Sequence, residues 1–477
     1  MKKYIPLIIF LFLFLGFNLF KVITDVRPFF DWDEGIYAQV GREMIEAKSY
    51  LVPLWQGKAW LDKPPVPSLL YGLMTYIPVQ HEISMRVLTV LLSGVALGLL
   101  YIYALRHSKS IFVALLTVII TSFLPAYLQR TQSLNVDVFL LIGWLGYVLW
   151  YRNLLAGAFF LSFGVLSKSL LGYYPVAMVF FFELSQWFFN KKKNKKEFIT
   201  YLINTGIQVG LSTLWFFGMF IQYRGDFIQY HFIDSHFKRV TASIEQHFGQ
   251  RTFYIDLLLE QLRYSIIPVV ISSLLLGFAV LKKRSKDAYF SLIFVPWFVF
   301  LNLTKTKIAW YLYPVLPQFV YLAVFFLSYI KKQWIQGVIS IVLLSYFFLE
   351  MIPLSSYMTT NFSTWEPHQR IAQDAQRSGC KQLFVLVNSS TRTSYATLKS
   401  MDLVINTTTW WGNHPSMAYY SNVTTLYYYS ISEFENKIHT AKSGACFTAE
   451  NEDWNTKWGL NEFAKNSIFT LGKSRYN

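Results

Sequence analysis

The feature that most constrains this chain is a series of apolar segments, each close to the length that a helix needs to cross a bilayer. That length is about 20 residues, and about eleven segments of the sequence reach or approach it. They cover residues 4–21, 84–105, 110–127, 134–151, 153–166, 170–189, 199–221, 262–281, 287–303, 308–330 and 334–353. Because lipid satisfies no backbone hydrogen bonds, such segments must be helical. The sequence therefore predicts an α-helical polytopic membrane domain.

A shorter apolar segment, 66–79, contains Pro67 and Pro78 and is a candidate for a re-entrant or half-buried helix. If it also crosses, the count rises, so we expect about 11–13 transmembrane helices. The first apolar segment follows Met1-Lys2-Lys3, and no small-residue cleavage site comes after it. We interpret it as a retained anchor.

Composition supports a membrane location. Hydrophobic residues make up 54% of the chain and charged residues only 15%, whereas soluble domains carry roughly 25% charged residues. The net charge of +16 could indicate nucleic-acid binding, but the Lys and Arg residues lie in short runs between apolar segments. Runs in such positions set membrane topology. We therefore expect membrane lipids, and no nucleic acid, as partners.

The basic runs also predict the orientation of the chain. Lys2-Lys3, Lys191-Lys192-Lys193 and Lys331-Lys332 fall in alternate loops and mark the cytoplasmic side, together with the N-terminus. The extracytoplasmic face then receives the loops 22–83 and 222–261 and the tail. The expected domains are 1–353, in the membrane, and 354–477, outside it.

The tail differs in composition from the rest of the chain. Asn, Ser, Thr and Asp return, and the runs 383–387 and 425–429 have the residues typical of strands, so we expect a small α/β domain. Its two cysteines, Cys380 and Cys446, would lie in an oxidising compartment and could pair, although the spacing does not decide this. Neither has a CxxC neighbour, which argues against a structural zinc site of cysteines.

Several Lys and Arg residues lie on the predicted outer face, where the positive-inside rule expects few of them, and they indicate a bound anion. Lys305 and Lys307 follow an apolar segment on the predicted outer face, and Arg130 and Lys168 lie at the ends of two others. The alternative is that these side chains only snorkel to water. Asp137 lies about one turn inside the next apolar run, where ionisable groups are functional candidates. Several cations on one face favour a lipid phosphate or pyrophosphate as the ligand.

The first outer loop supplies acidic groups. Asp31, Asp33 and Glu34 precede 36–45, whose apolar residues have helical spacing and predict an amphipathic helix in the membrane interface. A helix N-terminus favours negative charge, so Asp33 could simply cap the helix. Three carboxylates exceed what a cap requires. Catalysis is the competing interpretation.

Four motifs in this order carry a family resemblance. They are Asp33-Glu34-x-x-Tyr37-Ala38-x-x-x-Arg42-x-Met44, Asp62-Lys63-Pro64-Pro65, Leu166-Ser167-Lys168 and Lys305-x-Lys307-x-x-x-Tyr311-x-x-Pro314-x-x-Pro317. In sequence and membrane position they resemble the GT-C superfamily of polytopic glycosyltransferases. Within it the likeness is to the lipid A 4-amino-4-deoxy-L-arabinose transferases and the protein O-mannosyltransferases. The resemblance spans about residues 31–317 of the chain.

The resemblance implies roles for single residues. Asp33 would be the first-loop carboxylate that acts as general base, with Glu34 beside it as a second catalytic acidic residue. Lys63 would contact the phosphate of the donor. The remaining substrate-binding candidates, from the charge pattern and the resemblance together, are Arg130, Asp137, Lys168, Arg239, Lys305, Lys307 and Tyr311.

The resemblance also suggests a divalent cation. Relatives often have Glu where this chain has Asp62, and that position with a loop His, here His236, can hold a metal. The carboxylate of Asp62 is one methylene shorter. No P-loop and no G-x-G-x-x-G after a strand is present in the sequence, so no nucleotide cofactor is expected.

The implied activity is transfer of one sugar, with inversion, from a polyprenyl-phosphate donor to a lipid or cell-envelope glycan acceptor, as in lipid A modification. The expected location is the bacterial plasma (inner) membrane, with chemistry on the outer face. A protein O-glycosyltransferase is one alternative. A polyprenyl-lipid flippase or transporter is another, and it would predict an internal repeat with ionisable groups near the bilayer midplane.

Overall fold

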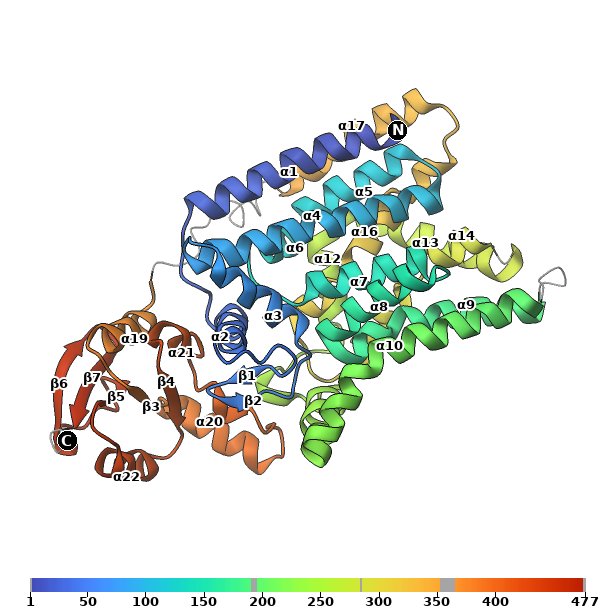
Figure 1. Ribbon diagram of the computed structural model, residues 1–477. Helices are drawn as coiled ribbons and strands as arrows, with labels where there is room; N and C mark the ends of the chain where they lie inside the picture. The colour runs from blue at the N-terminus through green and yellow to red at the C-terminus, as the bar shows by residue number, and fades with distance from the viewer. Residues whose placement is uncertain (1, 190–194, 284, 352–364, 475–477) are drawn as a thin grey trace.

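The computed structural model describes residues 2–189, 195–283, 285–351 and 365–474. Helices make up most of it, and a small mixed sheet forms the C-terminal part (Figure 1). This confirms the predicted class, a helical membrane domain with a small α/β domain after it. The predicted domain boundary after residue 353 lies outside the described residues.

Among the described residues, five helical stretches are long and apolar enough to cross a membrane, or six if one bent pair counts as a span. The five are Lys2–Thr24, His81–Ser108, Leu154–Phe188, Phe253–Lys282 and Lys286–Leu303. The bent pair is α5 (Ile111–Phe123) and α6 (Pro125–Thr131), which meet at 72°. Three further apolar helices are shorter: Asp137–Trp150, Leu316–Tyr329 and Gln333–Leu349.

This count is lower than the predicted 11–13 crossings, because breaks divide the apolar segments into helices of unequal length. Pro125 begins α6 at the bend, since proline cannot continue the preceding helix. The three shorter helices have 10–17 residues, below the roughly 20 that span hydrocarbon alone. The helices lie where the apolar pattern predicted them. The number that cross the membrane stays a prediction.

The stretch Leu154–Phe188 contains a chain reversal. It divides into α8 (Leu154–Lys168) and α9 (Tyr174–Phe189), joined through Ser169, which has a φ of 56°. A Cβ added to Gly172 would lie 2.4 Å from the backbone nitrogen of Val165. Residues seven apart in a continuous helix are about 10 Å apart along the axis, so the chain folds back here. This agrees with the two separate segments predicted from the sequence.

The helices of the membrane part pack around a buried core and expose apolar side chains outward. Their remaining bounds are α1 (Ile5–Thr24), α4 (His81–Ser108), α7 (Asp137–Trp150), α10 (Lys195–Phe227), η4 (Ile228–Lys238), α11 (Arg239–Thr241), α12 (Phe253–Leu262), α13 (Ile266–Lys283), α14 (Lys286–Phe290), α15 (Val295–Leu303), η7 (Ala309–Leu312), α16 (Leu316–Val324) and α17 (Gln333–Met351). Phe12 of α1 is 77% exposed and Leu281 of α13 is 82% exposed. Such exposure suits a lipid-facing surface.

The first loop lies between the helices and the C-terminal domain (Figure 1). It contains α2 (Asp33–Glu46), the hairpin of β1 (Leu54–Trp55) and β2 (Lys58–Ala59), and α3 (Val66–Leu73). α2 packs against α3 and against α21 (Ser416–Ser421). A Cβ on Gly72 would lie 2.3 Å from the carbonyl oxygen of Gly41, so two glycines permit this close packing. That α2 lies in the membrane interface stays a prediction.

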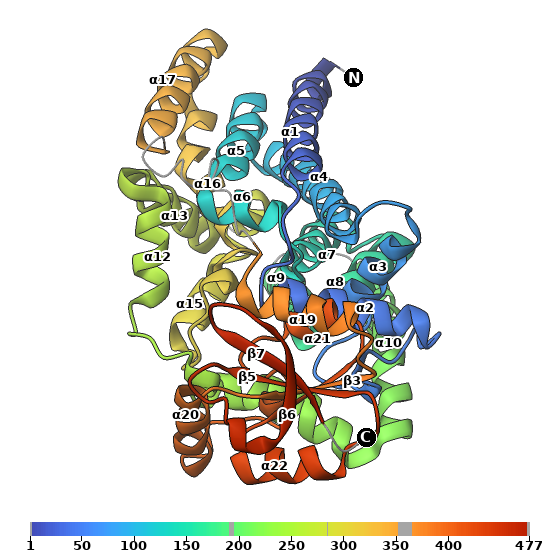
Figure 2. The same ribbon diagram turned by 90° about the vertical axis from the view of Figure 1, so that its left-hand side faces the viewer.

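The C-terminal domain contains a five-stranded sheet in the order β4-β3-β5-β7-β6 (Figure 1). Figure 2 shows this sheet at the opposite end of the molecule from α17 and the N-terminus. The strands are β3 (Gln382–Leu386), β4 (Thr424–Tyr428), β5 (Ala445–Glu450), β6 (Leu460–Lys465) and β7 (Phe469–Ser474). β3 pairs in parallel with β4 and β5, while β7 pairs antiparallel with β5 and β6. Helices α19 (Pro367–Arg377), α20 (Ser389–Ser400) and α22 (Ile431–Thr440) complete the domain. Both predicted strands are confirmed.

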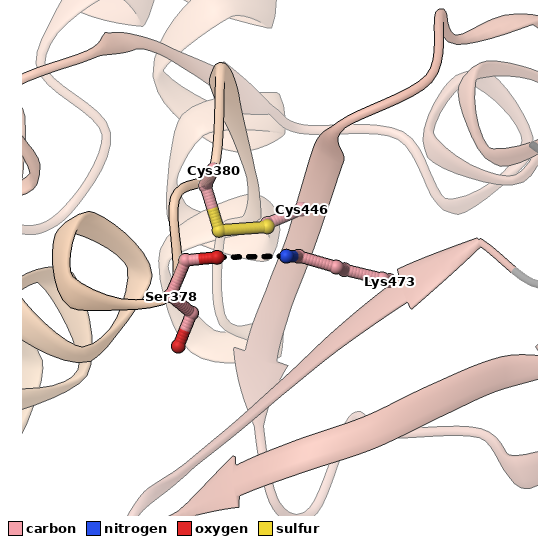
Figure 3. The surroundings of a disulfide bond; sticks show 4 residues. All are labelled: Ser378, Cys380, Cys446 and Lys473. Carbon is pink, nitrogen blue, oxygen red and sulfur yellow. Dashed lines mark hydrogen bonds between the residues drawn. A yellow bond between two sulfur atoms is a disulfide. The ribbon is translucent and has the colours of Figure 1, made fainter.

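A disulfide joins Cys380, just before β3, to Cys446 in β5 (Figure 3). The Cα atoms lie 5.7 Å apart, and the two cysteines are 66 positions apart in sequence. Beside it, the Nζ of Lys473 donates a hydrogen bond of 2.8 Å to the carbonyl oxygen of Ser378. The cysteine pairing that the sequence left open is therefore settled.

Candidate functional site

The candidate site centres on four charged side chains at helix ends. Asp33 is the first residue of α2 and Asp137 is the first residue of α7, where the positive end of each helix dipole favours a carboxylate. Lys168 is the last residue of α8, where the dipole favours a cation, and Arg130 lies in the last turn of α6. The sequence pattern thus sets each charge at a suitable terminus, and tertiary packing brings the four together.

Arg130 connects the two carboxylates. Both of its Nη atoms lie 3.3 Å from Oδ2 of Asp33, and Nη2 lies 2.8 Å from Oδ2 of Asp137. Lys168 forms an ion pair with the other oxygen of Asp137. Asp137 is fully buried and has a cation at each oxygen, so its charge is compensated where it stands.

Asp33 is the more available of the two carboxylates. Its side chain is 27% exposed, and within the described part of the chain its Oδ1 has no hydrogen-bond partner. Burial raises the pKa of Asp33, and the neighbouring Arg130 opposes that shift. A carboxylate with one free oxygen and a raised pKa is suited to accept a proton.

Two aromatic rings of η7 lie over the cations. The guanidinium of Arg130 lies 5.3 Å from the ring centre of Trp310, and the ammonium of Lys168 lies 4.7 Å from that of Tyr311. Such contacts stabilise a cation by about 0.5–2 kcal/mol. Four predicted residues, Arg130, Asp137, Lys168 and Tyr311, are therefore brought together around Asp33.

A second group of side chains, which are cationic or can donate hydrogen bonds, lies next to the four charged residues. Its members are Lys63, His236 and Arg239. Lys63 forms no ion pair or hydrogen bond through its ammonium with any described residue, and its neighbours include Arg239 and Lys168. Burial, followed by the charge of Arg239, lowers the pKa of Lys63 to about 8. Buried Nε2 of His236 and buried Nε of Arg239 also lack partners in the described structure. Unpartnered buried donors of this kind are expected where an anion binds.

Asp62 lies at the border between the membrane part and the C-terminal domain. It is buried, and its Oδ2 accepts a 2.7 Å hydrogen bond from the hydroxyl of Thr407. No third His, Cys, Asp or Glu of the described residues joins Asp62 and His236 at ligand distance. Metal binding by this pair stays a prediction.

The segment 402–408 of the C-terminal domain covers the loop that carries His236 and Arg239. Thr408 donates to Glu245 at 3.1 Å, and Glu245 in turn pairs with Arg239 at 3.0 Å. Asn406 donates to Asp234 at 2.8 Å. The C-terminal domain is thus part of the site, and the sequence contained no signal for this contact.

Several predicted residues lie outside the cluster. Lys307 donates to the carbonyl oxygens of Leu301 and Asn302 at 3.2 and 3.0 Å, where it caps the end of α15. Lys305 has an exposed side chain. Neither ammonium contacts Asp33, Arg130, Asp137 or Lys168 in the described structure, and their role in substrate binding stays a prediction.

Glu34, expected beside Asp33 in catalysis, points into a separate buried ion pair. Arg86 reaches both of its oxygens, at 3.0 and 2.7 Å. The backbone N–H groups of Phe30 and Leu134 donate to Glu34 as well, at 2.7 and 2.9 Å. These four donors already use the lone pairs of the Glu34 carboxylate, so it is not available to accept a proton from a substrate.

One residue of the site received no role from the sequence. Tyr37 lies one helical turn after Asp33, is buried, and has a pKa raised by burial and by the charges of Asp33 and Asp137. Tyr37 is four residues after Asp33, so a helix predicted there places both on the same face; this spacing was the signal in the sequence that could have identified Tyr37.

Comparison with known proteins places these features in context. The family described as dolichyl-phosphate-mannose-protein mannosyltransferase matches residues 62–216. An uncharacterized protein of Aquifex aeolicus (strain VF5) is 27% identical over 376 residues, which cover 75% of this chain and 70% of that protein.

Solved structures share the fold at low sequence identity. ArnT from Cupriavidus metallidurans bound to undecaprenyl phosphate has a TM-score of 0.66 and 15% identity, over 97% of both chains. The archaeal oligosaccharyltransferase AglB from Archaeoglobus fulgidus, in complex with an inhibitory peptide and a dolichol-phosphate, has a TM-score of 0.59 and 10% identity. That match covers 100% of this chain and 75% of AglB.

Proposed function

We propose that this chain, which has the GT-C fold and resembles ArnT and the protein mannosyltransferases, moves one sugar from a polyprenyl-phosphate donor to an acceptor. The acceptor is a lipid, such as lipid A, or a glycan of the cell envelope. Transfer takes place on the extracytoplasmic face of the bacterial inner membrane and inverts the anomeric centre.

One observation carries the proposal: an accessible carboxylate, Asp33, near a lysine, Lys63, whose ammonium has no ion pair or hydrogen bond among the described residues. Asp33 keeps one oxygen free, and Lys63 interacts electrostatically with it while forming no ion pair in the described structure. An acceptor proton and a leaving phosphate need these two groups on either side of the reacting carbon. Undecaprenyl phosphate bound to ArnT, and dolichol-phosphate bound to AglB, support a polyprenyl phosphate as the carrier.

In the proposed reaction the polyprenyl tail holds the donor at the membrane surface, so the sugar is already positioned. Lys63 and Arg239 bind the phosphate and stabilise the negative charge that it gains as the glycosidic bond breaks. Asp33 takes the proton of the acceptor hydroxyl as the new bond forms at the opposite face of the carbon. Arg130 orients Asp33 and is itself fixed by Asp137.

The disulfide supports the proposed orientation. Disulfides persist in oxidising compartments and are rare in the cytosol, so the bond between Cys380 and Cys446 fits a C-terminal domain outside the membrane. The segment 402–408 of that domain contacts the loop with Arg239 indirectly, through Glu245. The site would then also face the outside.

A protein acceptor is the second candidate, because the family matching residues 62–216 is described as protein mannosyltransferases. Donor chemistry would be the same in both cases. The identity of the labelled product separates them.

The test measures transfer of radiolabelled sugar from polyprenyl-phosphate donors in membranes that contain the intact chain, Asp33→Asn or Asp226→Asn. Asp226 is an exposed carboxylate near the end of α10 and serves as the matched control. We expect D33N to lower transfer by about 100-fold or more, and D226N to leave it unchanged. Equal transfer by D33N and the intact chain would refute the role of Asp33. Absence of transfer from every donor would favour a flippase.

A further inference from the structure

A cluster of one Asp and two His lies between the first loop and the C-terminal domain. Asp31 comes two residues before Asp33, His368 lies in α19, and His414 lies just before α21. Trp32, between the two aspartates, has a φ of 68°, and the chain turns there so that Asp31 faces the C-terminal domain while Asp33 faces Arg130. The proposed reaction uses none of the three residues.

The ligand atoms of this cluster lie close together. Nδ1 of His414 lies 2.8 Å, and Nε2 of His368 lies 3.4 Å, from the same oxygen of Asp31. All three atoms lie within 4.8 Å of one another. In a tetrahedral zinc site with bonds of about 2.1 Å, neighbouring ligand atoms are about 3.4 Å apart. Small side-chain movements would bring the three atoms to that spacing.

The surrounding contacts are those that orient metal ligands. Nδ1 of His368 lies 3.3 Å from a carboxylate oxygen of Glu366, the arrangement that fixes a ligating imidazole through its other nitrogen. The other carboxylate oxygen of Asp31, Oδ1, accepts a 2.9 Å hydrogen bond from the backbone N–H of Ser416. The hydroxyl of Ser416 lies 3.1 Å from Nε2 of His368 and could supply a fourth ligand or hold a water there.

Two of the three side chains are buried, so the charge of Asp31 has to be compensated within the protein. Asp31 is 8% exposed and His368 is 2% exposed, and the two imidazole rings stack at 4.0 Å. A buried carboxylate facing two stacked imidazoles needs either protons or a cation to compensate it. Two imidazoles and one carboxylate are a donor set that suits Zn²⁺.

We propose that Asp31, His368 and His414 bind one Zn²⁺ ion, which fastens the C-terminal domain to the first loop next to Asp33. The site is independent of the proposed reaction. It is also separate from Asp62 and His236, which lie at the other contact between the two domains. Its function is to hold the first loop in place, since two ligands come from the C-terminal domain and one from that loop.

The test counts zinc by mass spectrometry in the full chain, purified in detergent without chelators and dialysed against a zinc-buffered solution. We expect His414→Ala and Asp31→Asn each to hold about one zinc per chain less than the intact protein, and His439→Ala to hold as much as the intact protein. His236→Ala reports separately on any zinc held with Asp62. His439 is exposed on α22 and controls for loss of any histidine. Zinc content in H414A and D31N equal to that of the intact chain, or a zinc-free intact chain, would overturn the proposal.

A second measurement does not depend on the folding of a variant. Co²⁺ replaces Zn²⁺ in such sites and absorbs visible light when four-coordinate. We expect stoichiometric Co²⁺ addition to the metal-stripped intact chain to produce that absorption, and excess Zn²⁺ to remove it. We also expect either ion to raise the melting temperature of the intact chain. No absorption and no thermal shift would refute the site.

Discussion

Arg86 of α4 and Glu34 of α2 form a two-pronged ion pair, in which Nη2 and Nε of Arg86 lie 2.7 and 3.0 Å from the two oxygens of Glu34. Both side chains are 3% exposed. Arg86 also donates to the backbone carbonyls of Arg27 and Pro28, so the pair fastens the start of the first loop to α4. Adjacent acidic residues, Asp33 and Glu34, therefore have different surroundings.

We predict that Glu34→Gln destabilises the protein without abolishing transfer. Removing one partner of a buried ion pair costs about 3–5 kcal/mol, because the other charge is left uncompensated. Thermal unfolding in detergent should show the loss, while turnover per folded molecule should stay within about threefold of the intact chain. In the double variant E34Q/R86M, part of the stability should return. Loss of turnover in a folded E34Q would instead assign Glu34 to the chemistry.

Binding of undecaprenyl phosphate should depend on the protonation of Lys63. Its pKa is lowered to about 8 by burial and by Arg239, so the ammonium is charged below pH 8 and loses its proton above it. We expect affinity to fall as pH rises from 7 to 9. In Lys63→Met, affinity should be about tenfold lower at pH 7 and nearly constant across that range. Lys465→Met, which alters an exposed lysine of β6, is the control. An unchanged pH profile in K63M would exclude Lys63 as the titrating group.

The contact between Thr407 and Asp62 should matter for donor binding. Thr407→Val removes the hydroxyl that donates to the buried carboxylate, an interaction worth about 1.5–3 kcal/mol. Because Asp62 adjoins Lys63, we expect donor affinity to fall about tenfold. Thr424→Val changes an exposed threonine of β4 in the same domain and should have no effect. Equal affinity in T407V and T424V would show that the C-terminal domain does not support the donor site.

The disulfide should stabilise the C-terminal domain. Closing a loop between cysteines 66 positions apart lowers the entropy of the unfolded chain by an amount equivalent to about 4 kcal/mol. We expect a reducing agent to increase protease cleavage of the sheet domain in the intact chain. The variant C380S/C446S should be cleaved at that higher rate with or without the reducing agent. Cleavage that is insensitive to reduction in the intact chain would contradict this prediction.

The sequence by itself determined the membrane class, the positions of most helices, the α/β tail and most of the residues in the charged cluster. These properties follow from local patterns. Apolar segments of sufficient length must be helical in lipid, and carboxylates before a helix and cations at its end are favoured by the dipole. For this reason Asp33, Arg130, Asp137 and Lys168 could be chosen from their positions along the chain.

Only the tertiary structure decided how residues distant in sequence combine. Glu34 and Asp33 are adjacent in sequence, but their side chains leave α2 in different directions. Glu34 therefore pairs with Arg86, and Asp33 pairs with Arg130. Lys307 caps α15, while Thr407 reaches Asp62 from 345 residues away. Contacts of that range depend on how helices and domains pack, and no local pattern encodes them. The same holds for His368 and His414, which the folded C-terminal domain brings to Asp31.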